Sequence, residues 1–129
     1  MQEKILVLDF GGQYNRLIAR RVRDHHVYAE ILPYTTGPEV IKNAGYKGII
    51  FTGGPNSVFD PSSPHYTPDI LSYGIPVLGI CYGCQLTAWM AGGEVKTAET
   101  SEYGKTEIKI EKDTSKLFDG VPEINTVWM

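Results

Sequence analysis

The chain has few cysteines, no excess of basic residues and no long apolar run. Its two cysteines, three positions apart among 129 residues, are too few for a disulfide framework and indicate a reducing, cytoplasmic setting. A net charge of −3 argues against a general nucleic-acid-binding protein, which would usually be basic. No apolar segment approaches the ~20 residues that span a bilayer, and the apolar run near the N-terminus is too short for a signal peptide. We therefore expect neither nucleic acid nor a membrane as partner.

The pattern of apolar residues predicts one α/β domain over residues 1–129, a length that supports a single hydrophobic core. Apolar runs indicate parallel strands that are buried on both faces, and a helical segment follows each run. The strands are expected at 4–10, 27–32, 48–52 and 76–80, and the helices at 14–22, 38–44, 68–73 and 82–91. In the last helix we expect Leu86, Trp89 and Met90 to pack against the sheet. Such alternation is typical of a doubly wound, mainly parallel sheet with helices on both faces.

The pattern of alternating strands and helices ends at Gly93. Residues 94–98, 106–111 and 124–129 read as β segments separated by polar turns, and we expect them to form antiparallel additions to the domain. The last three residues, Val127-Trp128-Met129, form an apolar strand with no turn or polar tail after it. Natural domains seldom stop in mid-strand, so we expect this domain to be incomplete at its C-terminus.

The most informative segment is Gly79-Ile80-Cys81-Tyr82-Gly83, which joins an apolar strand to a helix. It is the cysteine form of the G-x-S-x-G nucleophile elbow, a sharp turn that lifts the nucleophile out of the sheet. Glycines two positions before and after the apex let the strand and the helix approach without a clash. The turn also puts the thiol at a helix N-terminus, which favours the thiolate, the form that attacks carbonyl carbon. The segment therefore predicts that Cys81 is a nucleophile.

Two other loops are expected at the same edge of the sheet, where ligands bind in parallel α/β proteins. Thr52-Gly53-Gly54-Pro55 follows the third strand, and we expect its backbone N–H groups to face the elbow. That position suits one donor of an oxyanion hole, with the N–H of Tyr82 as the other. Asp9-Phe10-Gly11-Gly12-Gln13 follows the first strand but lacks the G-x-G-x-x-G pattern of a dinucleotide-binding turn.

Three segments, in this order, resemble the glutamine amidotransferase domain of GMP synthetases. They are Asp9-Phe10-Gly11-Gly12-Gln13-Tyr14 with Leu17-Ile18-Ala19-Arg20-Arg21-Val22 behind it, Thr52-Gly53-Gly54-Pro55-Asn56-Ser57, and Gly79-Ile80-Cys81-Tyr82-Gly83-Cys84-Gln85-Leu86. The last two occur widely in class I, triad-type glutamine amidotransferases, and the first points to the GMP synthetase branch. The resemblance runs from about residue 4 to the end of the chain. It implies the flavodoxin-like fold of the class I amidotransferases.

By this resemblance Cys81 attacks the side-chain amide of glutamine, Gly54 and Tyr82 supply the oxyanion N–H groups, and Gly54 and Gln85 hold the substrate. The resemblance also implies that ammonia passes to a synthetase that aminates xanthosine monophosphate to GMP in purine biosynthesis. We expect that synthetase, fused or separate, to bind ATP and magnesium; no cofactor, metal or synthetase (ATP-pyrophosphatase) domain is expected in this chain. The family's catalytic His-x-Glu pair lies further along than Met129, so we expect this chain alone to be inactive.

Cys84 leaves other interpretations open. With Cys81 it forms a C-x-x-C pair at a helix N-terminus, which is typical of thiol–disulfide oxidoreductases. Those folds carry the motif early, however, whereas here three βα units precede it. A zinc site would need a second pair of ligands. A third possibility is a non-catalytic glutamine-binding or regulatory module that keeps the elbow but has no base. In the amidotransferase interpretation, Cys84 is expected to be a small apolar filler on the elbow helix.

Overall fold

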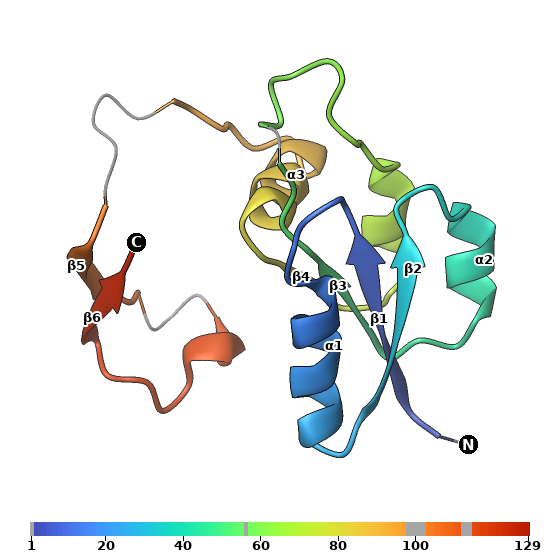
Figure 1. Ribbon diagram of the computed structural model, residues 1–129, viewed down its shortest axis with the longest axis horizontal. Helices are drawn as coiled ribbons and strands as arrows, with labels where there is room; N and C mark the ends of the chain where they lie inside the picture. Colours follow the sequence, from blue (N-terminus) through green and yellow to red (C-terminus); the bar gives the residue numbers. More distant parts are fainter. Residues whose placement is uncertain (1, 56, 98–102, 112–114) are drawn as a thin grey trace. The chain divides into compact units, whose positions relative to one another are not determined.

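The computed structural model describes residues 2–55, 57–97, 103–111 and 115–129. The chain divides into two compact units, Met1–Val95 and Lys96–Met129. Figure 1 shows the helices and strands of each unit along the chain. Within the described ranges, no helix is long and apolar enough to cross a membrane. The expectation of one domain over residues 1–129 stays a prediction.

The first unit is built on a four-stranded parallel sheet with the order β2-β1-β3-β4 (Figure 1). Its strands are β1 (Lys4–Asp9), β2 (Tyr28–Pro33), β3 (Gly48–Phe51) and β4 (Val77–Gly79). All three pairings are parallel, which confirms the expected sheet. Leu8 pairs with Phe51, and Phe51 pairs with Gly79, so the loops that follow β1, β3 and β4 begin at the same edge.

Helices cover both faces of this sheet, as the sequence predicts. Val7 of β1 packs with Ala19 of α1 (Asn15–Asp24) on one face. Its neighbours Leu6 and Leu8 point to the other face, because successive side chains of a strand alternate. There they share a core with apolar residues of α2 (Pro38–Asn43), η1 (Pro68–Ser72) and α3 (Tyr82–Met90). Full burial of each large aliphatic side chain contributes roughly 1.5–3 kcal/mol to folding.

Two local expectations in this unit are wrong. Leu86 and Met90 are buried as expected, but Trp89 is 47% exposed. Leu86 and Met90 are four residues apart and share the face of α3 that meets the core, whereas Trp89 lies beside that face with its ring 5.1 Å from the ring of His65. Residues 94–97 form no strand. Val95 instead packs against the core cluster, and Ala98 lies outside the described residues.

The second unit contains a two-stranded antiparallel sheet of β5 (Lys105–Lys109) and β6 (Ile124–Trp128). The short 3-10 helix η3 (Lys116–Phe118) lies between the two strands in the chain. Gly104 and Met129 extend the ladder by exchanging two backbone hydrogen bonds, of 3.0 and 2.8 Å. These strands confirm the antiparallel segments expected near 106–111 and 124–129.

Candidate active site

Cys81 lies at the apex of a strained turn between β4 and α3. Its backbone has φ 56° and ψ −117°, a conformation that residues with a side chain rarely adopt. The backbone N–H of Gly83 donates to the carbonyls of Ile80 and Thr52, each at 3.0 Å, and so ties the turn to the end of β3. The Cys81 thiol is free and the residue is exposed. This is the geometry of the predicted elbow.

Glycine is required on both sides of the apex because the backbones touch there. A Cβ atom on Gly79 would lie 2.6 Å from the carbonyl oxygen of Gly83 and 2.7 Å from the backbone of Cys84. A Cβ atom on Gly83 would lie 2.3 Å from the carbonyl oxygen of Phe51. Real Cβ contacts are never this short, so each glycine allows a close approach between strand and helix.

The Gly53–Gly54 segment lies against the elbow, as the sequence predicts. A Cβ atom on Gly53 would contact Cys81, at 3.6 Å from its Cβ and 3.9 Å from its Sγ. Neither the N–H of Gly54 nor that of Tyr82 donates to another backbone carbonyl of the described residues outside the regular helices and strands. The N–H groups of Gly54 and Tyr82 thus have no backbone acceptor among these bonds, and their role as oxyanion donors stays a prediction.

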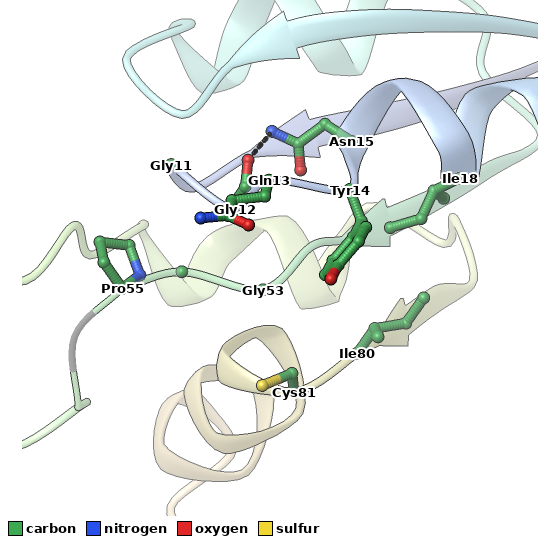
Figure 2. A pocket seen from close by; sticks show the side chains of 11 residues that line it. Gly11, Gly12, Gln13, Tyr14, Asn15, Ile18, Gly53, Pro55, Ile80 and Cys81 are labelled. Atoms are coloured by element: carbon green, nitrogen blue, oxygen red, sulfur yellow. Dashed lines mark hydrogen bonds between the residues drawn. The ribbon is translucent and has the colours of Figure 1, made fainter.

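A pocket of about 340 Å³ opens in front of Cys81 (Figure 2). The elbow and the Gly53–Pro55 segment form two of its sides, and the third comes from Gly11–Asn15 and Ile18. A Cβ atom on Gly12 would lie 2.6 Å from the carbonyl oxygen of Gly53, so the loops after β1 and β3 are in direct contact. A volume of this size is at the lower end of the range for small-molecule sites.

The loop after β1 lies at the ligand-binding edge where the sequence places it, but the sequence analysis assigned no site role to its residues. The structure puts Gly11–Asn15 in the wall of the pocket. Asn15, which begins α1, braces this loop by donating from Nδ2 to the carbonyl of Gly12 at 3.1 Å (Figure 2). The Oδ1 atom of Asn15 is buried and accepts no hydrogen bond from the described residues.

Gln85 lies one helical turn after Cys81, and its N–H donates to the carbonyl of Cys81 at 3.2 Å. Its side chain is exposed, and it does not contribute to the pocket walls. Its role in holding a substrate stays a prediction.

Cys84 is exposed, so the expectation of a packed apolar filler is wrong. The reason is its place on α3, whose buried positions are Tyr82, Gly83, Leu86 and Met90. Both cysteines are free thiols. Among the described residues, no group of three or more His, Cys, Asp or Glu side chains could hold a metal ion.

The three histidines lie outside the walls of the pocket. His25 and His26 follow the end of α1. His65 lies in the loop before η1, where its Nδ1 is 2.8 Å from the carbonyl oxygen of Ser63 and its ring contacts Trp89. The described pocket walls therefore contain the free thiol of Cys81 and the backbone of Gly54, but no histidine.

The sequence matches the family model described as glutamine amidotransferase class-I over residues 6–129. Among curated proteins, it is 58% identical over 128 residues to a GMP synthase [glutamine-hydrolyzing] of Clostridium novyi and 57% identical over 127 residues to that of Ruminiclostridium cellulolyticum. These matches cover 99% and 98% of this chain and 25% of each relative. The chain thus spans about a quarter of the length of the curated relatives it matches.

The same fold occurs in a solved structure from Thermoplasma acidophilum, whose name describes it as one of the subunits of a GMP synthase. The TM-score is 0.75 at 28% sequence identity, and the match covers 99% of this chain and 64% of that one. It confirms the expected class I fold. The family match also favours the amidotransferase interpretation of the C-x-x-C segment over the oxidoreductase one. The chain belongs to the class-I glutamine amidotransferases.

Proposed function

We propose that this chain carries the nucleophile and the oxyanion hole of a glutamine-hydrolysing enzyme that supplies ammonia for GMP synthesis. The observation that carries the proposal is Cys81, which stands exposed on a strained elbow at the mouth of a pocket. The backbone N–H groups of Gly54 and Tyr82 are free on adjoining segments. A nucleophile with backbone N–H donors close beside it is the arrangement that acyl transfer requires.

In the proposed reaction, the Cys81 thiolate attacks the side-chain amide carbon of glutamine and forms a tetrahedral intermediate. The negative charge on the former carbonyl oxygen is stabilised by the N–H groups of Gly54 and Tyr82. Collapse of the intermediate breaks the C–N bond, and the nitrogen takes up a proton and leaves as ammonia. Water then hydrolyses the γ-glutamyl thioester to glutamate and regenerates the thiol. Gln85 is proposed to hold the substrate from the second turn of the elbow helix.

Two steps of this sequence need a base, first for the departing ammonia and then for the attacking water. The described pocket walls contain no histidine. We infer that the base is supplied by a part of the complete enzyme outside these walls, which the family resemblance identifies as a His-x-Glu pair.

The ammonia is proposed to pass to a synthetase that aminates xanthosine monophosphate to GMP, with ATP and magnesium bound by the synthetase. The names of the curated relatives support this destination, since they are GMP synthases of the glutamine-hydrolysing kind. The substrate of the present chain would then be glutamine alone.

The test is Cys81→Ala in the complete synthase, with Cys84→Ala as the matched control because both cysteines are exposed in the same turn. Cys81→Ala is expected to abolish GMP synthesis from glutamine and to spare synthesis from added ammonia, which bypasses the thiol. Cys84→Ala should retain both activities. Equal loss of the two activities in Cys81→Ala would contradict the proposed role. Loss of glutamine-dependent synthesis in Cys84→Ala would instead favour a dithiol mechanism.

A further inference from the structure

Tyr82 has a side chain that the proposed mechanism does not use, although its backbone N–H is one of the proposed oxyanion donors. The residue is 1% exposed, and its ring lies 5.9 Å from that of Phe10 in a tilted arrangement. Its phenol O–H donates to the carbonyl of Pro64, 18 residues away in the sequence. The Tyr82 side chain therefore interacts with Phe10 and Pro64, which lie outside its own helix.

The aromatic ring of Tyr82 lies next to Gly54. A Cβ atom on Gly54 would lie 3.4 Å from Cγ and from Cδ1 of Tyr82, and 2.9 Å from the carbonyl oxygen of Phe10. The ring of Tyr82 therefore faces Gly54 at a distance that a methyl group would just fill. One proposed donor belongs to Gly54 and the other to the residue whose ring faces it, so the position of this ring bears on the separation of the two N–H groups.

The same side chain holds the far end of the segment that begins at Gly54. Its hydroxyl reaches Pro64, and the described residues in between are braced internally. The hydroxyl of Ser63 donates to the carbonyl of Ser57, and the Ser63 N–H donates to the carbonyl of Asp60 at 2.9 Å. The bond to Pro64 also fixes the orientation of the Tyr82 ring, which faces Gly54.

We propose that the side chain of Tyr82 is a positioning residue for the oxyanion hole, holding Gly54 with its ring and the returning segment with its hydroxyl. This inference rests on the proposed function, because it assigns a task to the support of the Gly54 and Tyr82 donors. The hydroxyl must stay protonated to donate to a carbonyl. Burial raises the pKa of Tyr82 above its usual value, which keeps the phenol neutral.

The test compares two alkylations of Cys81, each followed by peptide mapping to separate Cys81 from Cys84. One reagent is the chloromethyl ketone analogue of glutamine, whose ketone oxygen takes the place of the amide oxygen; the thiolate displaces chloride and forms a thioether. The other is iodoacetamide, which lacks the α-amino and α-carboxylate groups of glutamine and so reports the intrinsic reactivity of the thiol. The ratio of the two rate constants therefore measures the pocket and its N–H donors.

Tyr82→Phe keeps the ring and removes only the hydroxyl, and Tyr66→Phe is the matched control. Tyr66 is also buried, and its hydroxyl donates to the carbonyl of Thr36 at 2.7 Å, away from the proposed donors. Tyr82→Phe should lower the ratio about tenfold, less than the ~100-fold or more that follows loss of an oxyanion donor. Tyr66→Phe should leave the ratio unchanged. Tyr82→Leu, which also removes the aromatic ring next to Gly54, should lower the ratio further.

An unchanged ratio in Tyr82→Phe, or an equal fall in Tyr66→Phe, would overturn the positioning role. The proposed function itself would fail if the wild-type protein showed no preference for the ketone and if glutamine did not protect Cys81 from it. If Tyr82→Leu fails to fold by circular dichroism, the comparison of the two phenylalanine variants still decides the question.

Discussion

Replacing Gly83 with alanine should destabilise the protein more than a typical single substitution. The new Cβ would lie 2.3 Å from the carbonyl oxygen and 2.7 Å from the Cβ of Phe51, and neither atom can move without its strand. Overpacking of this kind costs about 1–3 kcal/mol. The shift would also weaken two bonds that join the elbow to β3, from Gly83 to Thr52 at 3.0 Å and from Ile80 to Phe51 at 2.9 Å, each contributing about 1 kcal/mol.

The expected loss is therefore about 3–5 kcal/mol, a large part of the ~5–15 kcal/mol that stabilises a typical domain. Urea unfolding followed by circular dichroism measures it. Gly37→Ala is the matched control, because Gly37 has φ −62° and a Cβ there meets nothing within 4 Å; it should change the free energy of unfolding by less than about 1 kcal/mol. Gly83→Val should be worse than Gly83→Ala. If Gly83→Ala unfolds at the wild-type urea concentration, the strand and helix are not in the close contact argued above.

Three further predictions concern glutamine hydrolysis, the backbone strain at Cys81 and one buried phenol. Purified residues 1–129 should release glutamate from glutamine far more slowly than the complete synthase, because the described walls of the pocket contain no histidine; a comparable rate would refute the inference that the base lies elsewhere. Cys81→Gly should be about 1 kcal/mol more stable than Cys81→Ala in urea unfolding, because glycine relieves the strain at φ 56°, and the reverse order would mean that the turn is unstrained. Burial, with a smaller contribution from Tyr73, raises the pKa of Tyr66 from 10.0 to about 12. Because the folded state favours the neutral phenol, Tyr66 contributes fully to the free energy of unfolding below pH 10. This contribution is lost as the pH rises to about 12. Tyr66→Phe should accordingly flatten the alkaline fall in the free energy of unfolding, and an unchanged slope would contradict this account.

Most of the features that the sequence predicted correctly follow from local patterns. The glycines at positions 79 and 83 around Cys81 indicated the elbow, because only close backbone contact requires glycine on both sides of an apex. The alternation of apolar runs with helical spacing indicated a parallel sheet covered on both faces, since strand and helix periods follow from backbone geometry alone. Both inferences concern residues a few positions apart, where spacing in the sequence determines the direction of each side chain.

The tertiary structure decided what depends on contacts between distant segments. The strand order places β1 beside β3, and this brings the loop of Gly11–Asn15 into the wall of the pocket. The exposure of Cys84 and Trp89 depended on which face of α3 the core covers. The bond from Tyr82 to Pro64 joins residues 18 positions apart. Periodicity specifies that a face is apolar, but the neighbour that covers it is set by the order of the strands and by the paths of the loops between them.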